Sequence, residues 1–371
     1  MGVARQGVGL QRGGLTVIGP GEPAPWFVAR TSGNARYHFD SVAGRYVVLS
    51  FFGSAGDALG AQVLAGFAQH GAQFNDDGAC FFGVSQDAED ERQARVADRV
   101  PGYRYFWDPA GDIAKAYGLD AGERRSLVID VSLRVIASLA YGADASAHVR
   151  SVMQVLQSLP PVASLDRQAP VLVTPAIFEP EFCSRLLDYY AERGGEDSGF
   201  MREVDGRTVG QIDHAFKRRH DCTIEDPALR EACADRVAKR LAPQIRRAFQ
   251  FNPTRMERYI VSCYEGKGQG RFRAHRDNTT RGTAHRRFAV SLFLNADYRG
   301  GELIFPEYGR RRYSAPQGGA VVFSCSMLHE ALPVLEGKRF MFLPFLYDEA
   351  AARIREQNAQ FLEDGKQGYK A

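Results

Sequence analysis

The chain has 371 residues, which is more than one typical domain needs and suits two domains. Hydrophobic residues make up 44% and charged residues 25% of it, as in ordinary soluble globular proteins. The formal net charge of +3 favours neither nucleic acid nor a membrane surface as a partner. Six scattered cysteines without a CxxC motif speak against a disulfide framework and a zinc site, and indicate a cytoplasmic protein.

In the first part of the chain, strand-like and helix-like segments alternate. Strands are expected at residues 46–52, 79–84, 126–130 and 135–140, the last two as a hairpin. Helices are expected at residues 59–70, 88–99, 112–117 and 147–158. This βαβ rhythm predicts an α/β sheet that is covered by helices.

Three prolines between residues 158 and 170 mark a linker, because proline interrupts helices and central strands. We place a first domain at residues 16–158, the linker at residues 159–169, a second domain at residues 170–350, and a C-terminal helix and tail at residues 351–371.

In the second domain, helical segments precede a series of short strands with glycine-rich connections. Helices are expected at residues 180–192 and at residues 226–249, the latter as one long or two short helices, with a final helix at residues 350–361. Strands are expected at residues 259–264, 272–277, 288–295, 302–305, 320–324 and 341–347. The pattern predicts an α+β domain built on an antiparallel barrel or jelly roll.

His275 and Asp277 lie two residues apart in a strand-like segment, so their side chains should point to the same face. His329 follows 52 residues after Asp277, and a barrel could bring it beside that pair. Two histidines and one carboxylate leave the other positions of an iron(II) ion open, as oxygen chemistry requires. A zinc hydrolase can use the same set, so these three residues alone leave iron and zinc open.

Arg339 lies ten residues after His329, on what should be the next strand. A 2-oxoglutarate cosubstrate that chelates iron through its keto-acid end needs a buried cation for its distal carboxylate. The planar fork of arginine binds a carboxylate through two hydrogen bonds. The combination of His275, Asp277, His329 and Arg339 therefore predicts an oxygenase that uses 2-oxoglutarate.

Several motifs of the second domain occur together in one order. They are Tyr264 with the loop EGKGQG, HRD at residues 275–277, SLFLN at residues 291–295, GGELIFP from Gly300, PQGGAVVF from Pro316 and HEALPVLEGKR from His329. From about residue 170 to residue 347 the chain resembles the prolyl-4-hydroxylase-type family of 2-oxoglutarate/Fe(II) oxygenases. The resemblance implies a double-stranded β-helix, iron(II) bound by the triad, 2-oxoglutarate held by Arg339, and a cofactor-binding role for Tyr264.

One departure from that family concerns the cosubstrate. Some relatives have a tyrosine that helps to bind 2-oxoglutarate where this chain has Phe293, and a phenyl ring donates no hydrogen bond. The carboxylate would then depend more on Arg339 or on another hydroxyl group. The resemblance implies consumption of O2 and 2-oxoglutarate, release of succinate and CO2, and hydroxylation of a C–H bond, for which ascorbate could serve as reductant.

The first domain contains GEPAPWF, VVLSFFG, ACFFGVSQD, FWDPAGDIAKAYGL and RRSLVID, and resembles a peroxiredoxin of the thioredoxin-fold superfamily. A peroxiredoxin needs an activated thiolate. Gly53, Asp57 and Gly60 stand where that family has its proline, threonine and cysteine, whereas Arg124 fits the arginine position. Cys80 lies within an apolar strand. We therefore expect an α/β domain without peroxidase activity, kept for stability, homodimer formation or substrate presentation.

Polar and basic segments surround these motifs. Residues 194–221 and 278–287 are expected to form lids over the site, because they are rich in glycine and polar residues. The basic clusters at residues 271–287, 310–312 and 217–219 are expected to be solvated loop charge; alternatively, they form an electropositive entrance for an anionic substrate. His214, His220 and His285 are expected to be solvated.

The sequence thus predicts a dioxygenase that hydroxylates an unactivated C–H bond of a protein, peptide, amino-acid-like or other small-molecule substrate. Two alternatives belong to other classes. A non-catalytic binding or scaffold protein is disfavoured by the complete triad with Arg339, and a thiol-dependent redox protein is disfavoured by the absence of a cysteine near Gly60.

Overall fold

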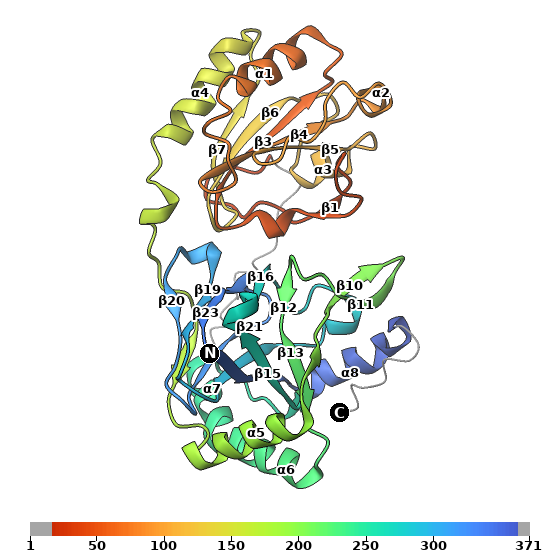
Figure 1. Ribbon diagram of the computed structural model, residues 1–371. Helices are drawn as coiled ribbons and strands as arrows, with labels where there is room; N and C mark the ends of the chain where they lie inside the picture. Colours follow the sequence, from red (N-terminus) through yellow and green to blue (C-terminus); the bar gives the residue numbers. More distant parts are fainter. Residues whose placement is uncertain (1–16, 363–371) are drawn as a thin grey trace, which may run out of the picture. The chain divides into compact units, whose positions relative to one another are not determined.

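A computed structural model describes residues 17–362. It divides the chain into two compact units between Leu165 and Asp166, inside the segment predicted as a linker (Figure 1). The predicted tail at residues 363–371 lies outside the described residues. None of the described helices is long and apolar enough to cross a membrane.

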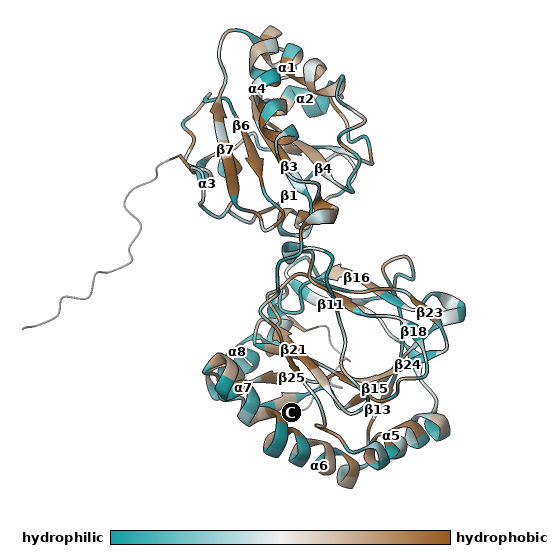
Figure 2. Cartoon of the chain, turned by 90° about the vertical axis from the view of Figure 1, so that its left-hand side faces the viewer, coloured by the Kyte–Doolittle hydropathy of each residue, from teal (hydrophilic) through white to brown (hydrophobic). Residues whose placement is uncertain are grey.

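The N-terminal unit is built on a five-stranded mixed sheet in the order β5-β4-β3-β6-β7. The strands are β3 (Tyr46–Gly53), β4 (Ala79–Ser85), β5 (Tyr103–Trp107), β6 (Arg125–Ile129) and β7 (Val135–Ala140). The first three run parallel, and β6 and β7 form the predicted antiparallel hairpin. A short pair, β1 (Val28–Ala29) and β2 (Tyr37–His38), lies apart from this sheet. Figure 2 shows the hydrophobic character of these strands.

Four α-helices accompany this sheet. They are α1 (Ala58–Ala68), α2 (Ala88–Arg92), α3 (Asp112–Ala116) and α4 (Ala145–Gln157). Val149, Val152 and Leu156 recur at helical spacing on one face of α4 and pack with α1 into the core. The helix predicted for residues 88–99 is wrong beyond Arg92, because Ala94 adopts a left-handed backbone conformation that a right-handed helix cannot include.

The C-terminal unit consists of two facing antiparallel sheets, the arrangement of a double-stranded β-helix. The larger sheet has the order β14-β25-β17-β24-β15-β13-β9, with β21 also paired to β17 and β8 paired to β21. Its strands are β8 (Leu172–Thr174), β9 (Glu196–Asp197), β13 (His220–Thr223), β14 (Arg255–Glu257), β15 (Ile260–Glu265), β17 (Phe288–Phe293), β21 (Ala320–Ser324), β24 (Lys338–Phe342) and β25 (Phe345–Tyr347). β-branched and aromatic residues dominate the longer of these strands, as buried sheets favour.

The smaller sheet has the order β12-β16-β22-β19-β20. Its strands are β12 (Lys217–Arg218), β16 (Arg271–His275), β19 (Leu303–Ile304), β20 (Arg312–Tyr313) and β22 (His329–Ala331). Two separate pairs complete the unit: β10 (Phe200–Val204) with β11 (Arg207–Gln211), and β18 (Arg299–Gly300) with β23 (Val334–Glu336). In Figure 2, β16 of the smaller sheet and β15 of the larger sheet lie on opposite sides of the C-terminal unit. A cluster of buried aromatic and aliphatic side chains fills the space between the sheets.

Helices cover the outer face of the larger sheet (Figure 1). They are α5 (Pro180–Arg193), α6 (Pro227–Arg236) and α7 (Ala242–Phe249), and α8 (Glu349–Asn358) follows the last strand. The helical segment predicted for residues 226–249 is two α-helices joined by a π-helical turn at Val237–Leu241. Pro243 lacks the N–H that would continue the regular ladder, which explains the irregularity.

The two predicted lids are more structured than expected. Residues 194–221 contribute β9, the β10–β11 hairpin, β12 and the start of β13. In residues 278–287 a short turn is capped by Thr280 and Thr283. His214 and His220 are exposed as predicted, but His285 is only 2% exposed, and its predicted solvation is wrong.

Candidate metal centre and cosubstrate pocket

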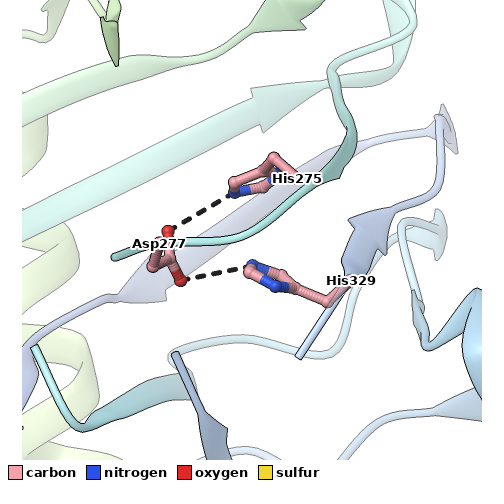
Figure 3. A group of neighbouring side chains, drawn as sticks. All are labelled: His275, Asp277 and His329. Atoms are coloured by element: carbon pink, nitrogen blue, oxygen red, sulfur yellow. Dashed lines mark ion pairs between the residues drawn. The ribbon is translucent and has the colours of Figure 1, made fainter. Parts of the chain in front are cut away.

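The three candidate metal ligands meet where β16 pairs with β22. His275 is the last residue of β16 and lies opposite His329, the first residue of β22. Asp277 follows just beyond the strand, and its N–H donates to the carbonyl oxygen of Cys325 at 2.9 Å. Asp277 Oδ1 lies 3.5 Å from His275 Nε2, and Oδ2 lies 3.3 Å from His329 Nε2 (Figure 3). All three ligand atoms lie within 4.8 Å of one another, which suits a single metal ion.

Both imidazoles are oriented by backbone carbonyl groups. His275 Nδ1 lies 2.7 Å from the carbonyl oxygen of Arg273, and His329 Nδ1 lies 3.1 Å from that of Met327. A carbonyl oxygen only accepts hydrogen bonds, so each Nδ1 carries the proton and each Nε2 offers a lone pair toward Asp277. Such contacts fix the tautomer and the ring orientation of metal-binding histidines. The ring of Phe272 also stacks on His275, with centroids 3.5 Å apart.

The protonation states suit a divalent cation. Burial, together with the neighbouring His275, lowers the pKa of His329 to about 4, so this imidazole is neutral at physiological pH. Burial opposes ionisation of Asp277, but the imidazoles of His329 and His275 outweigh it and lower the pKa of that carboxyl group. Metal ligation requires neutral imidazole and ionised carboxylate. The donor set of two nitrogens and one oxygen fits iron(II), and by itself it also fits zinc.

Arg339 forms a second, buried feature of the same unit. It lies on β24, directly opposite Tyr264 on β15, and is 1% exposed. Its guanidinium carbon lies 5.1 Å from the ring centroid of Tyr264 and 5.2 Å from that of Phe293. Its Nε and Nη2 have no hydrogen-bond partner within residues 17–362. A buried cation with unused donors is unfavourable by itself, so this pocket fits an anion such as the distal carboxylate of 2-oxoglutarate.

Comparisons with known proteins agree with this geometry. The profile of the 2OG-Fe(II) oxygenase superfamily matches residues 259–347, and that of the AhpC/TSA family matches residues 20–138. A PKHD-type hydroxylase of Shewanella baltica is 31% identical over 180 residues, which cover 44% of this chain and 76% of that protein. The chain belongs to the PKHD-type hydroxylases.

Other PKHD-type hydroxylases show similar agreement. The PKHD-type hydroxylase of Paraburkholderia phytofirmans is 28% identical, and the match covers 43% of this chain and 72% of that protein. The PKHD-type hydroxylase of Burkholderia ambifaria is 30% identical, and the match covers 50% of this chain and 81% of that protein. Among solved structures, a Pseudomonas putida prolyl-4-hydroxylase is 17% identical, with a TM-score of 0.37 over 51% of this chain and 95% of that chain. Peroxidoxin BcpB from Mycobacterium tuberculosis is 18% identical, with a TM-score of 0.35 over 38% and 99%.

Tyr264 of this PKHD-type hydroxylase contacts two arginines. Its side chain packs beside Arg339, and its hydroxyl oxygen accepts a hydrogen bond from Arg219 Nη1 at 3.3 Å. Arginine has only donors, so the hydroxyl hydrogen of Tyr264 is not used in that bond. It can be donated to a molecule in the pocket.

A buried polar cluster, which we call the Lys217 cluster, lies beside Tyr264. It consists of Lys217, Arg219, Asp221 and Ser198. Arg219 Nη2 donates to Asp221 at 2.6 Å, and Lys217 Nζ donates to Ser198 Oγ at 2.7 Å. Lys217 and Arg219 are 3% and 4% exposed, so their predicted solvation is wrong. Their spacing of two along an extended segment could have indicated that they share one face.

The basic stretch at residues 271–287 also contains buried, paired arginines. Arg286 Nε donates to Glu257 at 2.7 Å, and His285 Nε2 lies 3.0 Å from the same carboxylate. Arg276 is likewise buried and paired with Glu307. Arg271 and Arg273 are not buried. The prediction of solvated loop charge is therefore correct only for part of this stretch, because two remote carboxylates draw arginines inward.

The pocket where a peroxiredoxin carries its thiolate is occupied by an ion pair. Arg124 Nη1 donates to Asp57 Oδ1 at 2.8 Å, and Asp57 also caps α1 by accepting from the N–H of Gly60. A Cβ atom at Gly60 would lie 2.0 Å from the carbonyl oxygen of Ser54, and one at Gly53 would lie 2.8 Å from Arg124 Nε. The AhpC/TSA-like domain thus has no room for a cysteine side chain at residue 60 with this backbone.

Proposed function

We propose that the C-terminal unit hydroxylates an unactivated C–H bond of a protein, peptide or amino-acid-like substrate, with consumption of 2-oxoglutarate and O2. His275, Asp277 and His329 would hold iron(II), and Arg339 would bind the distal carboxylate of 2-oxoglutarate. The observation that carries the proposal is the buried guanidinium of Arg339 with two unused nitrogens.

The two parts of the site border the same core cluster. The ring of His329 lies 4.5 Å from that of Phe323, and Arg339 lies between Tyr264 and Phe293. Phe323, Tyr264 and Phe293 all belong to the cluster between the two sheets. A cosubstrate could therefore be bound at the metal by one end and at Arg339 by the other.

The chain's own residues would provide position, charge balance and exclusion of water. When bound, iron(II) with 2-oxoglutarate would supply the activation of O2 that oxidation of a C–H bond requires. The carbonyl groups behind His275 and His329 keep both Nε2 atoms directed at the metal position. The aromatic rings around Arg339 exclude water and so strengthen its attraction for a carboxylate.

The Lys217 cluster supports a substrate that carries a negative charge. The positive charges of a divalent metal and of Arg339, less the negative charge of Asp277, balance the two negative charges of 2-oxoglutarate. Arg219 then pairs with Asp221, Lys217 donates to Ser198 rather than to a carboxylate, and the buried Nε of Arg219 has no partner within residues 17–362. The carboxylate of Asp277 is near enough to raise the pKa of Lys217, although burial and Arg219 lower it far more. An anionic substrate group would offset the buried charge of Arg219 and favour the charged form of Lys217.

The cosubstrate proposal is tested without knowledge of the substrate. Anaerobic Fe(II) and 2-oxoglutarate should give a weak visible charge-transfer band with the natural protein. His275→Ala should abolish the band, whereas Arg339→Met should require a much higher 2-oxoglutarate concentration to reach it. Lys239→Met, which changes an exposed lysine paired with Asp235, is the control and should behave like the natural protein. A missing band in the natural protein, or an intact band in His275→Ala, contradicts the proposal.

The substrate charge is tested with small probes. Saturation-transfer NMR compares two sets of probes on protein loaded with Zn(II) and 2-oxoglutarate. One set is N-acetylated amino acids with a free carboxylate, and the other is the same compounds as neutral amides. We expect the acids to bind in preference to the amides, and Lys217→Met to remove that preference. Equal binding of acids and amides to the natural protein would contradict an anionic substrate and leave the cosubstrate proposal unaffected.

A further inference from the structure

Phe293 leaves one side of the Arg339 pocket without a hydrogen-bond donor. The phenyl ring is 1% exposed and lies against the guanidinium group, with the guanidinium carbon 5.2 Å from the ring centroid. A carboxylate has two oxygens with several lone pairs, and a single guanidinium group satisfies only part of them. A donor besides the Tyr264 hydroxyl is therefore expected near Arg339, on an element other than β17.

Tyr298 lies beside Arg339, in the connection between β17 and β18. Its ring is half-buried and packs against the cluster between the sheets. Burial raises the pKa of the Tyr298 hydroxyl, and the charge of the nearby Arg339 guanidinium opposes that rise. A guanidinium group has no acceptor, so the hydroxyl hydrogen of Tyr298 remains available for an acceptor such as a carboxylate.

The connection that carries Tyr298 is attached to the strand that carries Arg339. Asn295 Nδ2 donates to the carbonyl oxygen of Lys338 at 2.7 Å, and the N–H of Phe340 donates to Asn295 Oδ1 at 2.8 Å. One side chain thus binds the residues on both sides of Arg339. Asn295 Nδ2 also donates to Asp297 at 2.6 Å, next to Tyr298. The position of the phenol relative to the guanidinium is therefore set by the backbone of β24.

Two glycines allow the chain to pass close to Arg339 and to Tyr298. Gly301 has a φ of +75°, and a Cβ atom there would lie 2.7 Å from Arg339 Cδ. Gly337 also has a φ of +75°, and a Cβ atom there would lie 3.1 Å from the Cα of Tyr298. Both positions need the left-handed conformation and the missing side chain that glycine provides. The backbone on both sides of the Arg339–Tyr298 pair is built for this contact.

We propose that the Tyr298 hydroxyl donates a hydrogen bond to the distal carboxylate of 2-oxoglutarate. The phenyl ring of Phe293 has no hydroxyl group and cannot donate this bond. The anion site is then a pair, Arg339 with Tyr298, and Tyr298 is a cosubstrate-binding residue. This inference rests on the proposed function, because it assumes that 2-oxoglutarate occupies the pocket of Arg339.

The test is the binding of 2-oxoglutarate to protein loaded with Mn(II) in place of iron, measured by isothermal titration calorimetry. Tyr298→Phe keeps the ring and removes the hydroxyl. We expect its Kd for 2-oxoglutarate to rise about tenfold, since a hydrogen bond to a charged group is lost. The Kd for 2-oxobutanoate, which has the keto-acid end without the distal carboxylate, should not change. Phe293→Tyr, added to Tyr298→Phe, should restore part of the affinity.

Two outcomes overturn the inference. An unchanged Kd for 2-oxoglutarate in Tyr298→Phe means that the hydroxyl does not contact the carboxylate. An equal loss for 2-oxoglutarate and 2-oxobutanoate means that Tyr298 only shapes the pocket. Arg339→Met, measured in parallel, distinguishes failure of the proposed cosubstrate site from failure of the role of Tyr298. If Arg339→Met also leaves the Kd for 2-oxoglutarate unchanged, the cosubstrate site is misplaced. If Arg339→Met raises that Kd and Tyr298→Phe does not, only the role of Tyr298 fails.

Discussion

Arg276 and Glu307 form a buried ion pair that joins the two segments carrying the candidate metal ligands. Arg276 lies between His275 and Asp277, and its Nη2 donates to Glu307 Oε1 at 2.8 Å. Glu307 Oε2 accepts from the N–H of Leu328 at 3.0 Å, immediately before His329. One carboxylate therefore fixes the separation between the first two ligands and the third.

Glu307→Gln should weaken metal binding without removing any ligand. Its loss of charge leaves Arg276 buried with a weaker partner, so the ligand segments are held less firmly. We expect about a tenfold rise in the Kd for Co(II), followed by its visible absorption, as for other residues that support metal ligands. Glu302→Gln is the matched control, because Glu302 pairs with the exposed Arg312 at 3.4 Å. Equal Kd values for Glu307→Gln and the natural protein would contradict this role.

The meeting of His275, Asp277 and His329 could be predicted from their combination in the sequence, whereas the roles of these residues and of Arg339 stay predictions. A spacing of two in a strand places His275 and Asp277 on one face, and the periodic apolar segments give the sheets. The buried cations could not be predicted in this way. Arg286 turns inward because Glu257 is buried near it, and nothing in the basic run around Arg286 reveals that carboxylate.

Tyr298 is a similar case. Its place beside Arg339 depends on the hydrogen bonds of Asn295 to β24, which join segments 43 and 45 residues apart in the chain. The sequence shows that Phe293 lacks a hydroxyl and that a replacement is needed. Only the fold shows that Tyr298, besides Tyr264, lies near the arginine.

Glu257→Gln should strongly destabilise the C-terminal unit. The carboxylate of Glu257 binds Arg286 Nε at 2.7 Å and His285 Nε2 at 3.0 Å, and Arg355 of α8 lies 3.5 Å away. Removing its charge leaves buried cations without compensation, which costs about 3 kcal/mol of unfolding free energy. Urea denaturation of the full chain measures this loss. Glu356→Gln, on the exposed part of α8, should lower the unfolding free energy by much less. Equal effects of the two variants would contradict the argument that Glu257 compensates buried cations.

The N-terminal unit should not reduce hydrogen peroxide, either as it stands or as the variant Gly60→Cys. Cys80 is fully buried, and burial raises the pKa of its thiol to about 12, so little thiolate forms at neutral pH. A side chain at residue 60 would meet the Ser54 carbonyl oxygen, so we expect Gly60→Cys to lower the thermal midpoint without gaining activity. Peroxide consumption with dithiothreitol measures the activity, with Cys80→Ser as control. Turnover that Cys80→Ser abolishes would restore the alternative of a thiol redox protein.

Glu179 should make the stability of the C-terminal unit depend on pH in the acid range. This residue precedes α5 and accepts hydrogen bonds from Arg236, at 2.7 Å, and from Arg240. Those bonds lower the pKa of Glu179 from 4.5 to about 2. Because the folded pKa is the lower one, the contribution to stability is complete above pH 4.5 and disappears as the pH falls to about 2.

Urea denaturation of the natural protein and Glu179→Gln across this pH range tests the effect. At neutral pH we expect the variant to be less stable by at most about 1 kcal/mol, because the carboxylate is partly exposed and solvent screens the pair. The difference should shrink as the pH falls from 4.5 toward 2, and also as salt is added. Glu181→Gln, which changes an exposed acid in the first turn of α5, is the control. A difference between Glu179→Gln and the natural protein that persists unchanged at the lowest pH would show that the carboxylate acts through packing rather than through its charge.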